Sequence, residues 1–249
     1  MADTWPRSPF VAFDEIDSTN TEARRRAESG DIGPMWITAS RQTAGRGRRG
    51  RDWESPGGNL AATLFFTTKR PPAEIAQLSF IAALAVADLA SSFVPPALVT
   101  VKWPNDVMID GSKTAGILVE SSAPERGKSW VAVGIGVNLA HAPTTTLYPA
   151  TAFARHMLAP PPKPLEALEI LSDAYERWCA IWEKGGFRPI AEAWTNRAHG
   201  LGQPCTANLP NESIEGIAEG LDPDGALRLR VAPGKTRRIF AGDVFFGPH

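Results

Sequence analysis

The sequence predicts an α+β fold: a mixed, largely antiparallel sheet packed by helices, followed by a small C-terminal β-barrel. Several short strand-like runs follow one another directly, which is typical of antiparallel pairing. Two long segments with helical spacing accompany these runs. After about residue 201 only short β runs and turns remain. We therefore divide the chain into a domain over residues 1–200 and a second domain over residues 201–249.

The first part of the chain is expected to mix strands and helices. Residues 10–16 alternate like a strand, and Thr19 with Glu22 forms a capping-box pattern that opens a helix ending near Gly30. An apolar helix is expected near 75–93; because it contains Asp88 and is short for a membrane span, burial against a sheet is favoured. The remaining strands are expected at 35–40, 60–67, 98–103, 107–109, 114–121 and 130–138.

Prolines separate this part from the rest. Residues 158–164 contain four prolines and are expected to form a stiff connector. A helix should run from Leu165 to Gly185–Gly186, and a second helix should lie near 190–197. Five short strands follow, which favour a barrel. This last segment carries a basic group that is either a solvated face or a contact for a carrier protein or nucleotide: Arg228, Arg230, Lys235, Arg237 and Arg238.

The composition is that of a soluble globular protein. Of 249 residues, 43% are hydrophobic and 21% are charged, and the formal net charge is −1, which argues against bulk nucleic-acid binding. Cys179 and Cys205 lack metal-like spacing, and the four histidines form no recognisable metal set. The N-terminus lacks the apolar core of a signal peptide. We expect a cytoplasmic protein with reduced thiols and no membrane contact.

Residues 42–53, Gln-Thr-Ala-Gly-Arg-Gly-Arg-Arg-Gly-Arg-Asp-Trp, form a loop between two expected strands. Its glycines permit close approach of a ligand, and its four arginines can grip phosphate or carboxylate oxygens in pairs. Trp53 offers a flat face for a base. The pattern predicts a site for a polyanion that carries a base, such as ATP. A solvated basic loop is the alternative, and a Walker A loop is excluded because no Gly-Lys-Ser/Thr follows.

A second polar group follows the apolar run 98–101. The sequence Lys-Trp-Pro-Asn-Asp occupies 102–106, and Asp110-Gly111 is a turn signal between two β runs. A hairpin there would bring Lys113 back near Lys102 and Asn105. Taken alone, Lys113 is equally compatible with a solvated residue that blocks a sheet edge.

Five motifs in order resemble the biotin protein ligase family. They are Ser18-Thr19-Asn20, the Gly-Arg-Gly-Arg-Arg-Gly run at 45–50, residues 102–106, Lys113 with 115–118, and Gly-Ile-Gly-Val-Asn at 134–138. The resemblance implies a catalytic fold like that of class II aminoacyl-tRNA synthetases and an SH3-like C-terminal domain. It also implies two reactions: biotin and ATP give biotinyl-adenylate, and the biotinyl group then passes to a lysine of a biotin carboxyl carrier protein.

The resemblance also implies the site residues. Lys113, Arg48 and Lys102 would be catalytic. Biotin would contact Ser18, Thr19, Asn20, Gln42, Gly45, Arg46, Gly47, Arg48, Lys113 and Gly116. ATP and the adenylate would contact Arg46, Arg48, Arg49, Arg51, Trp53, Lys102, Asn105 and Asn138. Arg49 and Arg51 are also compatible with solvated positions, and Ser18-Thr19 with an ordinary helix N-cap. Mg2+ is expected with the phosphates, and Asp106 either helps to hold it or braces the strand turn.

Two rival functions and some further expectations accompany this interpretation. A lipoate or octanoyl ligase-transferase would share the sheet, but its apolar substrate needs no partners for a ureido ring. A non-catalytic sensor of biotin or a nucleotide is the second rival. Only seventeen residues precede Ser18, so no DNA-binding domain and no repressor role are expected. The resemblance leaves a homodimer open, and residues 140–148 match no motif that we can assign.

Overall fold

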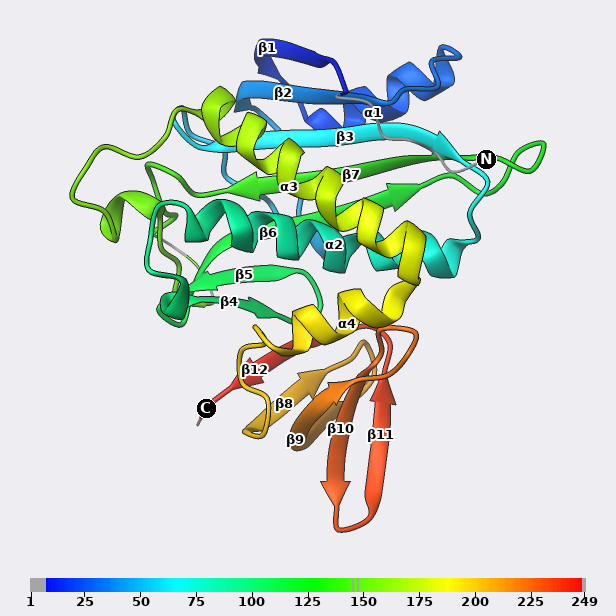
Figure 1. The fold of residues 1–249 in the computed structure, drawn as a ribbon, viewed down its shortest axis with the longest axis vertical. Coiled ribbons are helices and arrows are strands. Elements are labelled where there is room, and N and C mark those ends of the chain that lie inside the picture. The colour runs from blue at the N-terminus through cyan, green and yellow to red at the C-terminus, as the bar shows by residue number, and fades with distance from the viewer. Residues whose placement is uncertain (1–7, 145, 147, 248–249) are drawn as a thin grey trace.

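A seven-stranded sheet forms the centre of the protein (Figure 1). The structure, a computed structural model, describes residues 8–144, 146 and 148–247. The strand order is β1-β2-β3-β7-β6-β5-β4. β1 pairs in parallel with β2, and every other neighbouring pair is antiparallel, as the predicted mixed sheet requires. The strands are β1 (Phe10–Ile16), β2 (Met35–Gln42), β3 (Leu60–Thr68), β4 (Val99–Lys102), β5 (Asp106–Ile109), β6 (Ser112–Ser121) and β7 (Ser129–Val137).

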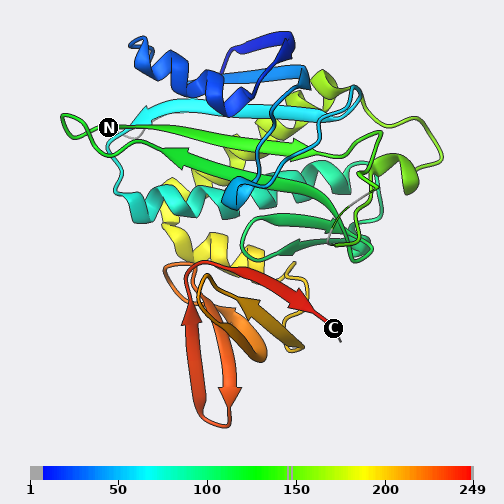
Figure 2. The ribbon, with the colours of Figure 1, turned by 180° about the vertical axis from the view of Figure 1, so that it is seen from behind.

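Helices cover both faces of this sheet, because successive strand residues point to opposite sides. Trp36, Leu64 and Val133 pack on the side of α2 (Pro72–Ser91), α3 (Pro164–Gly185) and α4 (Phe187–Thr195). The alternate residues Ile37 and Phe65 pack with Ala23 of α1 (Thr19–Glu28) on the other side. Figures 1 and 2 show these two layers from opposite directions. The α1 side is the thinner one and leaves part of the sheet for a site.

Helix α2 is the core helix of the molecule. By length and composition this helix could cross a membrane, but 67% of its apolar 18-residue stretch is buried inside the protein. It contacts α3, α4 and strands β4 to β7, which explains why it is apolar on nearly all sides.

The start of α1 differs from the predicted capping box. The helix begins at Thr19 with Ser18 at the N-cap position, and no side chain caps its first turn. Glu22 instead pairs with Arg25 and Arg26 at 3.0 and 2.9 Å. The Thr19 side chain turns to Gln42 of the neighbouring strand. The pattern fails here because Thr19 bonds Gln42 of β2, which is distant in sequence, and Glu22 pairs with arginines one turn further along the same helix.

The C-terminal part is a five-stranded antiparallel sheet of order β11-β10-β9-β8-β12. No backbone pairing joins its outer strands β11 and β12 within residues 201–247, so hydrogen bonds do not close the expected barrel. Three arginines of the basic group have acidic partners: Arg230 with Glu219, Arg237 with Glu212, and Arg238 with Asp222 and Asp224. The strands are β8 (Pro204–Asn208), β9 (Ser213–Leu221), β10 (Leu227–Ala232), β11 (Lys235–Ile239) and β12 (Asp243–Phe246).

The two parts share one continuous hydrophobic core. The Phe80 ring of α2 lies against Gly225, in the turn between β9 and β10, and the Phe246 ring of β12 lies 5.4 Å from that of His199. The buried Trp103 indole donates to the carbonyl of Gly225 in the C-terminal sheet at 3.1 Å. These contacts place β12 beside the ends of the strands that carry the predicted site (Figure 2).

Candidate active site

The predicted hairpin between β5 and β6 forms and returns Lys113 to the site. Asp110 and Gly111 both have positive φ, 49° and 70°, as a tight two-residue turn requires. The turn sets Met108 opposite Lys113. The Lys113 ammonium consequently lies 2.5 Å from the Asp106 carboxylate and 5.7 Å from the Trp53 ring centroid. Lys113 therefore lies close to residues 42–53, which we call the glycine–arginine loop.

A cavity of about 430 Å³ lies on the α1 side of the sheet, a size suited to small organic ligands. Fourteen of the sixteen residues predicted for the site line it. They are Ser18, Thr19, Asn20, Gln42, Arg46, Gly47, Arg48, Arg51, Trp53, Lys102, Asn105, Lys113, Gly116 and Asn138. Gly45 and Arg49 do not line it. Gly45 instead accepts a backbone hydrogen bond from Trp53 at 2.9 Å and so closes the base of the loop.

Neutral polar groups form one part of the wall. The Gln42 side-chain oxygen accepts from the Thr19 backbone at 2.9 Å, and its amide nitrogen donates to Ser55 at 2.9 Å. The buried Thr63 hydroxyl lies 2.8 Å from Thr19 Oγ1 and 2.6 Å from Asn20 Oδ1. The network holds side chains that both donate and accept, as recognition of a neutral amide-like ring requires. Thr63 was not predicted, although a polar residue inside an otherwise apolar run was the available signal.

Two glycines of β7 shape the floor. A Cβ on Gly134 would collide with the Asn20 side chain, and a Cβ on Gly136 would collide with the Trp53 indole. Gly116 on the neighbouring strand β6 lies beside the same indole and the Lys113 ammonium. Because β7 carries no side chain at these two positions, Asn20 and Trp53 can lie directly against the backbone of the sheet. The Gly-Ile-Gly-Val-Asn motif owes its glycines to these close approaches.

Three cations form another part of the wall. Arg48 donates to Asn105 Oδ1 at 3.0 Å, and the Asn105 amide is fixed by donation to the Ile117 carbonyl at 2.6 Å. Burial lowers the pKa of Arg48 and the pKa of Lys102 from their ordinary values. Lys102 is only 9% exposed, and its ammonium lies 5.1 Å from the Tyr148 ring centroid. Together with Lys113, these cations favour an anion at this end of the cavity.

The other arginines and Asn138 have protein partners. Arg46 contacts Glu120 at 3.2 Å, and Glu120 also accepts from Asn20 at 2.7 Å. Arg49 and Arg51 both contact Asp243 of the C-terminal sheet. The buried Asn138 donates its amide to the Thr151 carbonyl at 3.1 Å. It therefore supports residues 149–151, which pair beside Lys113.

Asp106 is the carboxylate that faces this cavity from β5. Within the described part of the chain, no three His, Cys, Asp or Glu side chains gather as a metal site. Mg2+ does not need such a cluster, because it binds readily through one or two carboxylates, water and substrate phosphates. Asp106 fits that role, and its present contact with Lys113 also fits a brace for the hairpin.

The sequence interpretation missed the contributions of Tyr148 and β12. Tyr148, within the unassigned segment 140–148, stacks on Phe245 with ring centroids 5.1 Å apart. Asp243 and Val244 of β12 line the cavity itself. No local motif marks these residues, because they reach the site only through the packing of the two parts of the chain.

Comparison with known proteins agrees with this architecture. Residues 12–138 match the model of the biotin/lipoate A/B protein ligase family, and residues 200–247 match the biotin protein ligase C terminal domain. The chain belongs to the biotin/lipoate A/B protein ligase family. Within that family it is a biotin protein ligase, because the second match is specific to that group and is supported by the relatives below.

Three relatives illustrate the similarity. The chain is 45% identical to a biotin--[acetyl-CoA-carboxylase] ligase of Paracoccus denitrificans over 93% of this chain and 98% of that protein. It is 32% identical to the bifunctional ligase/repressor BirA of Escherichia coli, over 86% of this chain and 67% of that protein. The fold matches the biotin protein ligase of Aquifex aeolicus in complex with biotin and ATP. The TM-score is 0.81 and the identity 23%, with 96% and 99% of the two chains covered.

Proposed function

We propose that this ligase activates biotin with ATP to biotinyl-5′-AMP and transfers the biotinyl group to a lysine of a biotin carboxyl carrier protein. The observation that carries the proposal is the composition of the cavity on the α1 side of the sheet. A neutral hydrogen-bonding network around Thr19, Asn20 and Gln42 shares it with the cations Arg48, Lys102 and Lys113. The ureido ring of biotin would bond the neutral network. Its carboxylate, at the end of an alkyl chain, and the phosphates of a nucleotide beside it would contact the cations.

The first step joins two anions. A carboxylate oxygen attacks the α-phosphorus, a P–O bond forms, and pyrophosphate departs with the electrons of the broken P–O bond. Arg48, Lys102 and Lys113 are held where they can stabilise the charge that develops. Mg2+, when bound through Asp106 and phosphate oxygens, would supply further neutralisation of the phosphates.

The second step uses the activated acyl group. A free carboxylate does not acylate an amine at neutral pH, because oxide is a poor leaving group. In the mixed anhydride the leaving group is AMP. The carrier lysine, as a neutral amine, attacks the acyl carbon and a C–N bond forms. The acyl C–O bond breaks, AMP departs with its electrons, and the nitrogen loses one proton to solvent. Arg48 and Lys113 would then stabilise the phosphate of the departing AMP.

The strongest rival within the family is lipoate or octanoate as substrate. A straight apolar acid would leave the buried Thr63–Asn20–Thr19 network without a ligand partner. The test is pyrophosphate release from ATP with biotin, octanoate or lipoate supplied separately. Release with biotin alone supports the proposal. Release with octanoate and none with biotin would overturn it.

The transfer step has its own test. Incubation with biotin, ATP, Mg2+ and a carrier domain should add one biotinyl mass to one carrier lysine, and a carrier whose acceptor lysine is replaced by arginine should gain none. Adenylate formation without transfer would restrict the proposal to activation.

The cytoplasm is the compartment that we propose, and the two cysteines are free as a reducing environment would keep them. The absence of DNA binding stays a prediction, and the homodimer stays an open alternative.

A further inference from the structure

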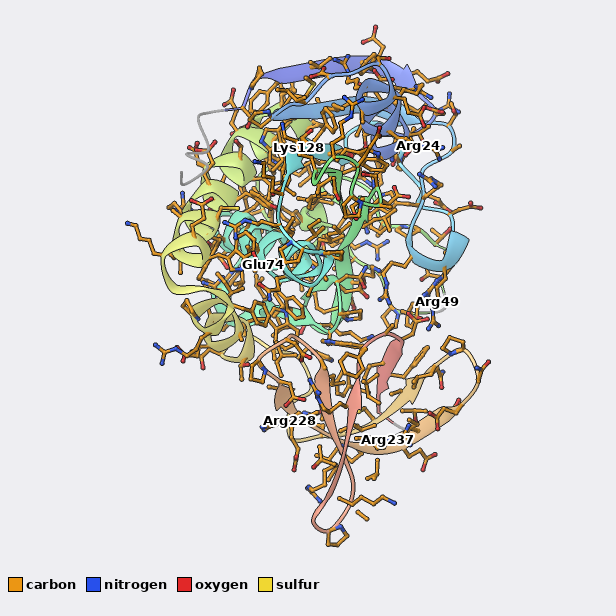
Figure 3. The ribbon with its side chains drawn as sticks, turned by 90° about the vertical axis from the view of Figure 1, so that its right-hand side faces the viewer. Arg24, Arg49, Glu74, Lys128, Arg228 and Arg237 are labelled. Atoms are coloured by element: carbon orange, nitrogen blue, oxygen red, sulfur yellow. The ribbon has the colours of Figure 1, made fainter. Side chains whose placement is uncertain are left out.

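The tip of the glycine–arginine loop is attached to the C-terminal sheet. Arg51 Nη2 donates to both carboxylate oxygens of Asp243 at 2.7 Å, and Arg49 Nη1 donates to the same carboxylate at 3.2 Å. Arg48 adds a contact of 3.4 Å to the Gly242 carbonyl. Arg49 lies at the end of the loop that faces the C-terminal sheet (Figure 3). One carboxylate thus joins two arginines that are more than 190 residues away in sequence.

A stack of aromatic rings strengthens the same junction. Arg51 Nη1 donates to the Tyr148 hydroxyl at 3.1 Å, and the Tyr148 ring stacks on Phe245, two residues after Asp243. The Arg51 guanidinium is therefore held by a carboxylate from one part of the chain and a phenol from the other. Because Nη2 contacts Asp243 and Nη1 contacts Tyr148, the two partners together fix the orientation of the guanidinium plane as well as its position.

Charge explains why the loop needs this partner. Arg46, Arg48, Arg49 and Arg51 lie within six residues and repel one another. Arg46 has Glu120 as a counter-charge at the base of the loop, and Asp243 serves the two arginines at the tip. Arg48 contacts only neutral oxygens, of Asn105 and Gly242, in the described contacts. The guanidinium of Arg48, half-buried in the cavity wall, is thus left for the substrate while its neighbours are neutralised.

We propose that Asp243 is a positioning residue that fastens the glycine–arginine loop over the cavity, so that retention of the acyl-adenylate depends on the C-terminal sheet. This inference rests on the proposed function for the identity of the retained intermediate. It assigns Arg49 and Arg51 to joining the two parts of the chain rather than to binding ATP. Loss of the carboxylate should free the tip of the loop and let the adenylate leave before the carrier arrives.

Limited trypsin digestion tests the attachment without any substrate. Cleavage after Arg49 and Arg51 in the full-length protein, followed by mass spectrometry, should be about fivefold faster in Asp243→Asn, since a partly exposed ion pair contributes on the order of 1 kcal/mol. Glu212→Gln removes a carboxylate that pairs with Arg237 on the same sheet, away from the loop, and should be cleaved like the wild type. Equal cleavage of Asp243→Asn and wild type would overturn the attachment.

Dissociation of preformed biotinyl-adenylate, followed by a chase with unlabelled biotin, tests the consequence. Asp243→Asn should release the adenylate about tenfold faster, whereas Asp243→Glu should restore much of the retention. Arg51→Gln should match Asp243→Asn, and the double variant should be no worse than either single one. If the rate increases of the two single variants multiply in the double variant, Arg51 binds the nucleotide independently of Asp243. If Asp243→Asn releases the adenylate at the wild-type rate, the junction does not retain the intermediate. Either result overturns the inference.

The two measurements separate failure of the inference from failure of the proposed function. If the wild type makes no biotinyl-adenylate, the proposed function fails, and the digestion result still decides whether Asp243 holds the loop.

Arg51→Lys is the second variant in case Asp243→Asn does not fold. It keeps the charge but offers one nitrogen in place of the two that contact Asp243 and Tyr148, so release should still be faster than in the wild type. Wild-type retention in a folded Arg51→Lys variant would count against the inference.

Discussion

At the residue scale, the site depends on cations that are held before any ligand binds. Lys113 has Asp106 at 2.5 Å, and Arg48 is oriented by Asn105. Lys102 lies against the Tyr148 ring, and no carboxylate among the described residues is in ion-pair contact with it. Fixed donors of this kind stabilise transition-state charge without reorganisation. The three side chains therefore have different surroundings, and their substitutions should have different effects.

Replacing Lys113 by alanine should reduce adenylate formation by about 100- to 1000-fold, as loss of one charge-stabilising donor does elsewhere. Biotin affinity should fall by no more than about tenfold, because the neutral network around Thr19 and Gln42 stays intact. A single-turnover assay and calorimetry measure the two quantities. Lys128→Ala, at an exposed lysine, is the matched control. Near-normal turnover of Lys113→Ala would refute the role.

Replacing Lys102 by methionine should separate stability from activity. Burial lowers the pKa of Lys102, which means that the folded protein disfavours its charge. A methionine of similar length should leave the free energy of unfolding unchanged or raise it by about 1 kcal/mol. Adenylate formation should nevertheless be lost. Urea denaturation and the pyrophosphate assay measure the two effects, and a clear drop in stability would contradict this account.

At the element scale, strands β6 and β7 form the floor of the cavity, and their glycines leave room there for the Trp53 and Asn20 side chains. Gly136→Ala should displace the Trp53 indole, because its Cβ would occupy the position of the ring. We expect the KM for ATP to rise about tenfold, since overpacking typically costs about 1–3 kcal/mol. Gly57→Ala, where the added Cβ would meet open space, is the control. Unchanged ATP kinetics in Gly136→Ala would show that the position of Trp53 does not matter.

Most elements could be predicted because they are set by local pattern. Strand-like runs placed β2, β3, β6 and β7 close to their observed bounds, and Asp110-Gly111 fixed the hairpin that returns Lys113. The capping box was wrong because Thr19 has a tertiary partner. The five antiparallel strands predicted for the C-terminal part are present, although no pairing among the described strands joins β11 to β12. Asp243 and Tyr148 were missed because their partners lie 192 and 97 residues away in sequence, beyond the reach of any motif.

At the scale of the whole molecule, the C-terminal sheet is part of the site and part of the core. His199 lies at this junction, with its ring 5.4 Å from that of Phe246 and its backbone donating to Val101 at 2.8 Å. Burial lowers the pKa of His199 below its ordinary value of 6.5, and the charge of Lys102 adds to the effect. Protonation of His199 therefore opposes the folded junction.

The pH dependence of stability follows from this shift. The unfolded chain takes up the proton first, so stability is fully present above pH 6.5 and falls as the pH drops below that value. His199→Gln should lose less stability than the wild type between pH 7.5 and pH 5.5, a range chosen to span the ordinary histidine pKa of about 6.5. Denaturation midpoints at both pH values measure this. His141→Gln, at an exposed histidine, should keep the wild-type slope. Equal slopes in wild type and His199→Gln would contradict the prediction.

The resting place of Trp53 gives the protein an intrinsic optical probe. Its half-buried indole lies on Gly136 and Gly116 with an ammonium 5.7 Å from its centre, in the very cavity that the substrates would enter. A purine settling against that indole, or a shift of Lys113 toward a carboxylate, changes the field and the quenching that the chromophore experiences. Stopped-flow emission from the unlabelled enzyme, with Trp53→Phe as the blank, would therefore time each arrival and departure separately.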